Sequence, residues 1–154
     1  MPTRTLSDVR CVAPEIVASA TLTVETSGEG FVEITGDARR FIEQSGAGEG
    51  VLALFIRHTS ASLTVQENAD PDVRVDLTTA LRRLAPADVG WVHDVEGPDD
   101  MPGHIKSMLT GVSLHVPVSG GAPALGTWQG IYLIEHRMRP HRREVVLQFI
   151  GSRR

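Results

Sequence analysis

The sequence has almost no cysteine and very little lysine. Cys11 is the only cysteine among 154 residues, which excludes an intrachain disulfide and a Cys-x-x-Cys metal knuckle. Lys106 is the only lysine, and 19 acidic residues outnumber 15 basic ones, so the net charge is −4. Non-specific binding to nucleic acid depends on basic side chains that meet phosphates. We therefore expect no nucleic-acid partner.

Long hydrophobic runs are also absent. The longest strictly apolar run is Val51–Ile56, whereas a membrane-spanning helix needs about 20 apolar residues. The first ten residues carry charges throughout and contain no apolar stretch, so no secretory signal is visible. We expect no membrane association and a cytoplasmic location.

Hydrophobic periodicity predicts a fold of about seven strands and three short helices. Alternation with a period of two residues predicts strands over 15–25, 31–34, 62–66, 112–118, 127–137 and 144–150. The continuous apolar run 51–57 predicts a central strand that is buried on both faces. Helical spacing predicts helices over 37–44, 71–84 and 102–109, with Thr35 and Asp70 as caps of the first two.

The order of these elements favours one class of fold. Strands come in pairs with helices between them, which favours an α+β fold built mainly from antiparallel sheet. A chain of this length predicts a single domain, spanning residues 1–154, at roughly 100–200 residues per domain.

A first polar cluster follows the apolar run of residues 51–57. It comprises His58-Thr59-Ser60-Ala61 and, a few residues later, Glu67-Asn68 and Asp70. Strand ends that meet loops can hold functional side chains on a rigid support. The alternative is a hydrogen-bonded histidine at the edge of the core, accompanied by Ser and Thr turn residues.

A second cluster lies in the predicted loop 86–103. Four acidic residues lie between His93 and His104, and like charges this close repel unless a cation offsets them. Histidine nitrogen and carboxylate oxygen suit several divalent metals, and such carboxylates also suit acid–base chemistry. The alternative is a solvated acidic loop in which Asp99 or Asp100 caps the following helix.

A third cluster lies near the C-terminus. It comprises Gly126-Thr127-Trp128-Gln129-Gly130 and Glu135-His136-Arg137. The two glycines suggest close approach by a backbone or a ligand. The alternative is an ordinary sheet surface on which Glu135 and Arg137 pair across strands. The Arg and His run 137–143 reads as a solvated hairpin or an anion-binding rim.

The three clusters resemble three signatures of the YjbQ family, also called the secondary thiamine-phosphate synthase enzyme family. The resemblance runs from about Thr5 to Gly151, and the order and spacing of the signatures fit. The matching segments are His58-Thr59-Ser60-Ala61-Ser62-Leu63-Thr64 with Glu67-Asn68-x-Asp70-Pro71, then His93-Asp94-x-Glu96-Gly97-x-Asp99-Asp100-Met101-Pro102-x-His104-Ile105-Lys106-Ser107, then Gly126-Thr127-Trp128-Gln129-Gly130-Ile131-Tyr132 with Glu135-His136-Arg137.

The resemblance implies a compact α+β fold, a homotrimer and a small-molecule substrate. It also implies a low thiamine-phosphate synthase activity, a transferase reaction that joins a hydroxymethylpyrimidine diphosphate to a thiazole phosphate and releases pyrophosphate. Two alternatives stay open. One is another metal-dependent reaction on a small phosphorylated or heterocyclic compound, and the other is a non-catalytic trimeric module that binds a metal or ligand.

The resemblance also suggests roles for individual residues. We expect a divalent metal, zinc or magnesium, and no organic cofactor, with metal ligands His93, His104 and His136. The expected catalytic residues are His58, Glu96, Asp100 and Lys106. The expected substrate-binding residues are Thr59, Ser60, Asn68, Asp70, Thr127, Gln129 and Arg137. In this scheme Glu96 or Asp100 acts as general base, while Lys106 and Arg137 offset phosphate charge.

Overall fold

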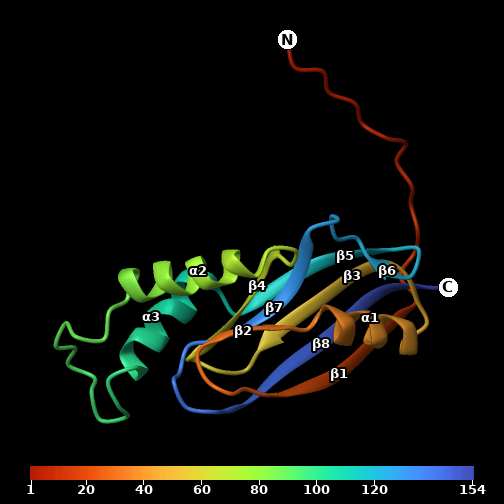
Figure 1. Ribbon diagram of the computed structural model, residues 1–154. Helices are drawn as coiled ribbons and strands as arrows, with labels where there is room; N and C mark the ends of the chain where they lie inside the picture. Colours follow the sequence, from red (N-terminus) through yellow and green to blue (C-terminus); the bar gives the residue numbers. More distant parts are fainter.

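The computed structural model describes residues 1–154 and contains eight strands and three helices (Figure 1). The strands are β1 (Ile16–Glu25), β2 (Gly30–Glu33), β3 (Ala47–Ile56), β4 (Ala61–Glu67), β5 (Ser113–Ser119), β6 (Ala122–Pro123), β7 (Gln129–Glu135) and β8 (Arg142–Arg153). The helices are α1 (Thr35–Gln44), α2 (Pro71–Leu84) and α3 (Asp100–Thr110). Residues 1–15 form neither helix nor strand, and the N-terminal end extends away from the rest of the chain.

The strands form two sheets in which every pair is antiparallel. The larger sheet has the order β1-β8-β3-β5-β6, and the smaller has the order β2-β7-β4. The predicted α+β fold with mainly antiparallel sheet is therefore confirmed. No helix has the length and apolar character needed to cross a bilayer.

The hydrophobic core joins both sheets to helix α1. Side chains of β3 and β8, such as Leu54 and Phe149, share one buried cluster with Leu63 of β4 and Leu133 of β7. Burying a side chain of this size contributes about 1.5–3 kcal/mol. Helix α1 adds the apolar stripe that its sequence predicts, including Phe41. This core holds the ends of β3, β4 and β7 rigidly.

Strand β3 is buried on one face only, so the prediction of burial on both faces is wrong. Leu52, Leu54 and Ile56 are fully buried, but Val51 is 43% exposed and Phe55 is 49% exposed. The outer face of the larger sheet carries no further layer within the chain. A continuous apolar run gives no indication of which face lacks a covering element.

One of the two expected helix caps is confirmed, and the alternative in which Asp99 or Asp100 caps the third helix is wrong. Asp70 caps α2, because its side chain accepts the backbone N–H of Asp72 at 2.9 Å. Thr35 does not cap α1: its hydroxyl donates to Glu33 Oε1 at 2.9 Å. Helix α3 begins at Asp100, and neither Asp99 nor Asp100 caps it through a side chain. The side chains of Thr35, Asp99 and Asp100 bond to other partners instead of to the free backbone N–H groups at the start of each helix.

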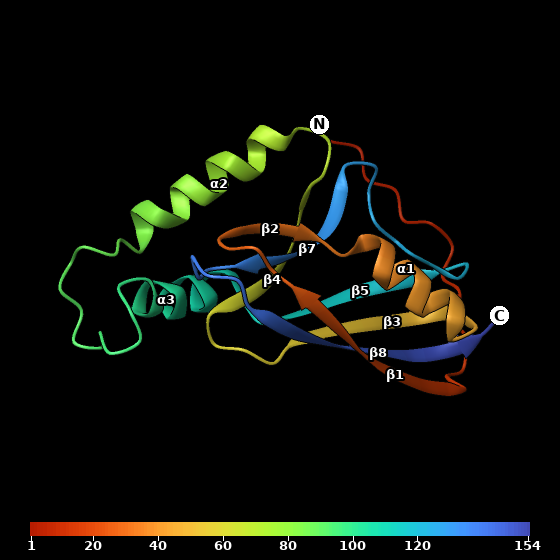
Figure 2. The same ribbon diagram turned by 60° about the horizontal axis from the view of Figure 1, so that its bottom comes forward.

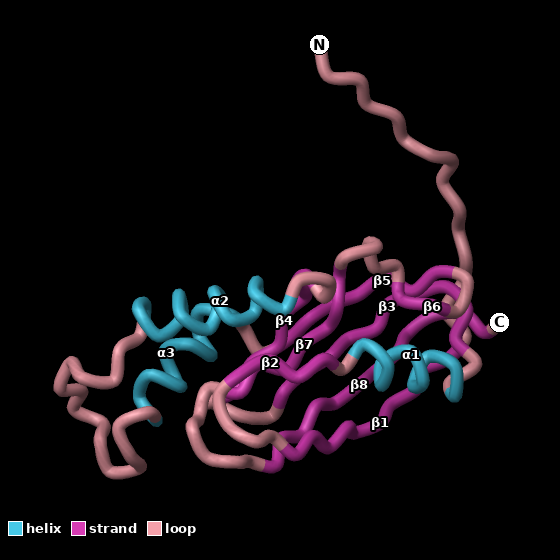
Figure 3. The backbone as a smooth tube through the Cα atoms, viewed as in Figure 1, coloured by secondary structure: helices cyan, strands magenta, loops and turns pink.

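Helices α2 and α3 lie together at one end of the two sheets (Figures 1 and 2). The tube in Figure 3 shows the α2–α3 connection at this end, near the turn that joins β7 to β8. The loop that joins β3 to β4 reaches the same region, because the backbone of Ser60 accepts the N–H of His136 at 3.3 Å. Three loops far apart in sequence therefore meet at the N-terminus of α3.

Candidate metal centre

Four side chains at the start of α3 can ligate a metal. His93, Glu96, Asp100 and His104 place one ligand atom each within 4.8 Å of one another. The first two come from the α2–α3 loop and the other two from α3. Asp100 and His104 are four residues apart, so helical periodicity puts both on one face. We call these four residues the metal cluster.

Asp100 is the centre of the metal cluster. Its Oδ2 atom lies 2.6 Å from His93 Nε2 and 3.1 Å from His104 Nε2. Glu96 Oε2 lies further out, 3.8 Å from His93 Nε2. The Asp100 side chain is 3% exposed, whereas that of Glu96 is 63% exposed. The cluster therefore has a buried base and an open side facing solvent.

The tautomer of His104 is set by the loop between β3 and β4. His104 Nδ1 lies 3.0 Å from the Thr59 carbonyl oxygen, which can only accept, so Nδ1 carries the proton. Neutral His104 then presents a bare Nε2 to Asp100 Oδ2. Two such acceptors approach only if a proton or a metal cation lies between them. A metal-ligating histidine usually donates its other ring N–H to a carbonyl or carboxylate oxygen, as His104 Nδ1 does to Thr59.

The donor set of the cluster fits zinc better than magnesium. Two imidazole nitrogens and one carboxylate oxygen are ordinary zinc ligands, and catalytic zinc sites leave a further position open. Magnesium prefers oxygen ligands and keeps several waters. His93, Asp100 and His104 would hold the ion, with Glu96 within reach of the open side.

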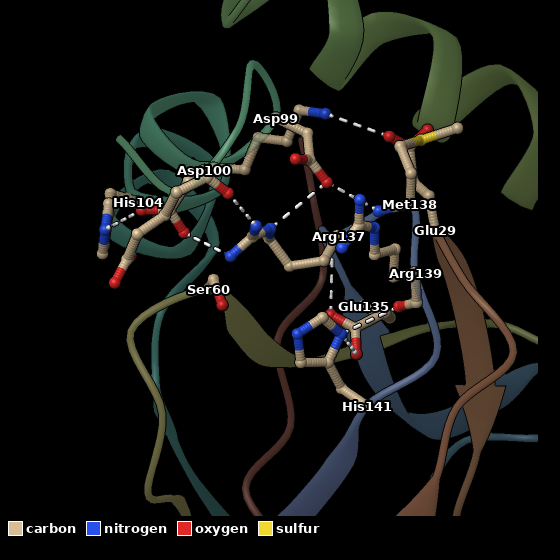
Figure 4. A network of polar contacts seen from close by, with 12 residues as sticks. Glu29, Ser60, Asp99, Asp100, His104, Glu135, Arg137, Met138, Arg139 and His141 are labelled. Atoms are coloured by element: carbon tan, nitrogen blue, oxygen red, sulfur yellow. Dashed lines mark hydrogen bonds and ion pairs between the residues drawn. The ribbon is translucent and has the colours of Figure 1, made fainter. Parts of the chain in front are cut away.

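Arg137 orients the carboxylate of Asp100. Its guanidinium donates to Asp100 Oδ1 at 2.5 Å and to Asp99 Oδ2 at 3.2 Å (Figure 4). It also donates to the Glu96 carbonyl at 2.8 Å. Because Oδ1 is occupied, Oδ2 is the oxygen left for the cluster. Burial raises the pKa of Asp100, but hydrogen bonds with His93 and Glu96 and the Arg137 charge outweigh burial and hold this pKa below its ordinary value.

A buried ion pair lies behind Arg137. Arg143 donates from Nε to Glu135 Oε1 at 2.8 Å and from Nη2 to Glu135 Oε2 at 2.5 Å. Burial raises the pKa of Glu135, but hydrogen bonds from Arg143, Thr26 and the Arg137 backbone N–H hold it below its ordinary value. Arg143 is 4% exposed. The sequence interpretation of this arginine as part of a solvated hairpin is therefore wrong.

The structure does not bring His136 to the metal cluster. His136 is buried, and its Nε2 lies 2.8 Å from Ser62 Oγ. It directly precedes Arg137, and successive side chains at the end of a strand point to opposite sides. Arg137 therefore reaches the cluster while His136 turns inward. Burial, with the charge of Lys106, lowers the pKa of His136 to about 3.

Lys106 also lies away from the open side of the cluster. Its side chain is 5% exposed, and Nζ donates to Glu29 Oε2 at 3.3 Å. Its charge is already offset by a carboxylate, as is that of Arg137. The cations expected to face a phosphate thus have protein partners.

His58 lies on the other side of His104. Its Nε2 accepts the backbone N–H of Glu144 at 2.9 Å. Burial, together with the charge of Arg143, lowers the pKa of His58. His58, Thr59 and His104 line a shallow hollow of about 350 Å³. This arrangement puts neutral His58 beside the cluster without direct contact.

The expected substrate-binding residues separate into two groups. Thr59, Ser60 and Arg137 lie at the metal-cluster end of the smaller sheet. The pairing of β4 with β7 joins Ala61 to Glu135 at this end and Glu67 to Gln129 at the other, about 20 Å away for strands of this length. The residues at the far end are Asn68, Asp70, Thr127 and Gln129.

Arg139 is a further cationic side chain beside the metal cluster. A groove of about 510 Å³ is lined in part by Glu96, Asp99, Arg137, Met138 and Arg139. Arg139 is exposed and forms no ion pair. The only sequence signal for this residue is its place in the Arg and His run 137–143, which does not separate it from Arg143.

Comparisons with known proteins agree on one family. A family model described as "UPF0047 protein YjbQ-like" matches residues 20–152. UPF0047 protein sll1880 of Synechocystis is 46% identical over 132 residues, covering 85% of this chain and 90% of that relative. UPF0047 protein YjbQ of Escherichia coli O157:H7 is 42% identical over 133 residues, covering 86% and 96%.

Solved structures support the same assignment. A YjbQ/UPF0047 family protein of Clostridium acetobutylicum has a TM-score of 0.78 at 36% identity, covering 84% of this chain and 98% of that one. A conserved hypothetical protein of Thermus thermophilus has a TM-score of 0.74 at 41% identity, covering 82% and 97%. The names of these four relatives state no activity.

Proposed function

The chain belongs to the YjbQ-like UPF0047 family, and on this premise we propose that it is a metal-dependent enzyme that acts on a small phosphorylated compound. The observation that carries the proposal is the convergence of His93, Asp100 and His104. A carboxylate between two imidazoles, open to solvent on one side, is the donor set of a catalytic metal site rather than of a closed structural one.

The surrounding residues suit that role. Bound zinc would supply a Lewis acid at the open side of the cluster. Arg137 keeps Asp100 Oδ2 directed at the cluster, and the Thr59 carbonyl holds His104 Nδ1, which leaves Nε2 as the nitrogen that faces the cluster. Glu96 is the exposed carboxylate nearest the cluster, so it can accept a proton from a substrate or water.

The groove beside the cluster supports a phosphorylated substrate. Arg139 has no carboxylate partner and lines the groove, so its guanidinium is free to pair with a phosphate. The reaction that we propose to assay first is thiamine-phosphate formation. The bond between the pyrimidine methylene and its diphosphate breaks, pyrophosphate leaves with the electron pair, and the thiazole nitrogen forms the new carbon–nitrogen bond.

In this proposal the functional unit is a homotrimer. An apolar row on the outer face of the larger sheet supports association between copies. Val17, Ile150 and Val51 are neighbours in register across three strands, and all three are exposed. Exposed apolar rows of this kind are typical of protein–protein contacts.

We expect purified protein to carry one divalent ion per chain and to make thiamine phosphate only when metal is present. Native mass spectrometry would report the number of chains and the metal content of the same sample. Protein stripped by a chelator and reloaded with Zn²⁺, Mn²⁺ or Mg²⁺ would then be assayed. Bound metal without turnover would favour a binding module, and failure to bind any of these ions would overturn the proposal.

Replacing Arg139 is expected to weaken substrate binding and to leave the rate of the chemical step nearly unchanged. Arg139→Gln removes the free guanidinium of the groove, so KM rises about tenfold while kcat changes little, since a surface hydrogen bond to a charged group contributes roughly 1.5 kcal/mol. Arg142→Gln is the matched control, because Arg142 is exposed and points away on β8. Equal KM values for the two variants would contradict the role given to Arg139.

A further inference from the structure

The buried ion pair between Glu135 and Arg143 makes hydrogen bonds beyond those that join its two members. Burying two charges costs desolvation energy, and an apolar pair of similar size often serves stability as well. Here both oxygens of Glu135, and Nη2 of Arg143, have a further partner. Arg143 Nη2 also contacts Ser60, and Glu135 also accepts from Thr26 at 2.7 Å and from the Arg137 backbone. Two of these further partners, Ser60 and Arg137, connect the ion pair to the metal cluster.

The first route runs through the loop between β3 and β4. Arg143 Nη2 donates to the Ser60 carbonyl at 3.2 Å and to Ser60 Oγ at 3.0 Å. Ser60 directly follows Thr59, whose carbonyl accepts from His104 Nδ1. A shift of Ser60 would therefore move the acceptor that sets the tautomer and ring orientation of His104.

The second route runs through the end of β7. Glu135 Oε2 accepts the backbone N–H of Arg137 at 3.2 Å, just where the strand ends. The side chain of Arg137 in turn holds Asp100 Oδ1. Figure 4 shows Ser60, Glu135 and Arg137 side by side below the start of α3. The two routes reach two different metal ligands from one ion pair.

We infer that Arg143, together with Glu135, is a positioning residue for the metal cluster, aligning His104 through Ser60 and Thr59 and aligning Asp100 through Arg137. Arg143 touches no ligand itself. The inference rests on the proposed metal site and assigns the pair a task beyond folding. Partners outside the ligand shell commonly change metal affinity by about 10–100-fold.

Replacing Arg143 is expected to weaken zinc binding about tenfold, at the low end of that range because it acts through other residues. Zinc affinity would be measured by competition with a chromophoric chelator, and the visible spectrum of Co²⁺-loaded protein would report ligand geometry. Arg143→Lys keeps the charge but cannot reach all four acceptor atoms, so it should recover part of the affinity. Arg142→Met is the control, because it removes an exposed arginine one residue away.

A double variant separates positioning from folding. Arg143→Met alone leaves the Glu135 carboxylate buried without a cation and can fail to fold, whereas Arg143→Met with Glu135→Leu removes both charges. We expect the double variant to regain melting temperature while zinc affinity and the Co²⁺ spectrum stay altered. Ser60→Ala, which deletes only one acceptor, should show a smaller loss of affinity at unchanged melting temperature.

The outcomes distinguish this inference from the proposed function. Wild-type affinity in the folded double variant would overturn the positioning role and leave the metal site intact. Wild-type protein that binds neither Zn²⁺ nor Co²⁺ would overturn the metal site and, with it, the positioning role.

Discussion

Asp100→Asn is expected to weaken zinc binding by more than about 100-fold, beyond the usual effect of residues outside the ligand shell. The substitution keeps the size of the side chain but removes the anionic oxygen that faces both His93 and His104. It also removes one of the two negative charges that Arg137 pairs with. Metal-dependent turnover should fall with metal occupancy, and excess Zn²⁺ should restore it only in part. Chelator competition and the assay with added metal would measure the two effects.

Asp94→Asn is the matched control for this result. Asp94 lies in the same loop and is exposed, and its side chain takes part in no ion pair. The control removes the same unit of negative charge near the cluster without removing a ligand. If Asp94→Asn weakens zinc binding as much as Asp100→Asn does, the loss reflects long-range charge and Asp100 is not a ligand.

Acidification is expected to lower the free energy of unfolding, with His136 as a main contributor. Burial, together with the charges of Lys106 and Arg143, lowers the pKa of His136 to about 3 against the opposing charge of Glu135, whereas the unfolded value is about 6.5. Between these values the unfolded chain binds a proton that the folded chain does not. Stability therefore falls as pH falls below about 6.5, by roughly 3 kcal/mol at about pH 4.5.

Urea unfolding of metal-free protein at about pH 7 and about pH 4.5 would measure this loss. His136→Gln should unfold more easily than wild type at the higher pH, yet lose less stability on acidification. His115→Gln is the control, because His115 lies on the exposed face of β5. Burial also lowers the pKa of His58, so His58 reduces the free energy of unfolding on acidification in all three proteins. Parallel pH dependence in wild type and His136→Gln would show that His136 is not the group responsible.

Much of the fold follows from local patterns in the sequence. Period-two alternation located β1 and β5, and the Asp70-Pro71 pair located the start of α2, because such patterns reflect backbone geometry over a few residues. The exposed face of β3 was missed because coverage of a sheet depends on distant elements. Thr35 was misread as a cap because its partners, Glu33 and Ile131, depend on the pairing of the smaller sheet.

The candidate site, like the fold, is predicted only in part by local patterns in the sequence. Local patterns predict seven of the eight strands, the three helices, the antiparallel α+β class and the acidic loop that contains candidate site residues such as His93 and Asp100, but they miss the short strand β6 and do not show which side chains converge. The packing of the folded chain places His136 and Lys106 inward, leaves Arg139 without a carboxylate partner, and buries Arg143 against Glu135. Those outcomes depend on how α3 packs on β4 and how the end of β8 meets the end of β7, which no local pattern encodes.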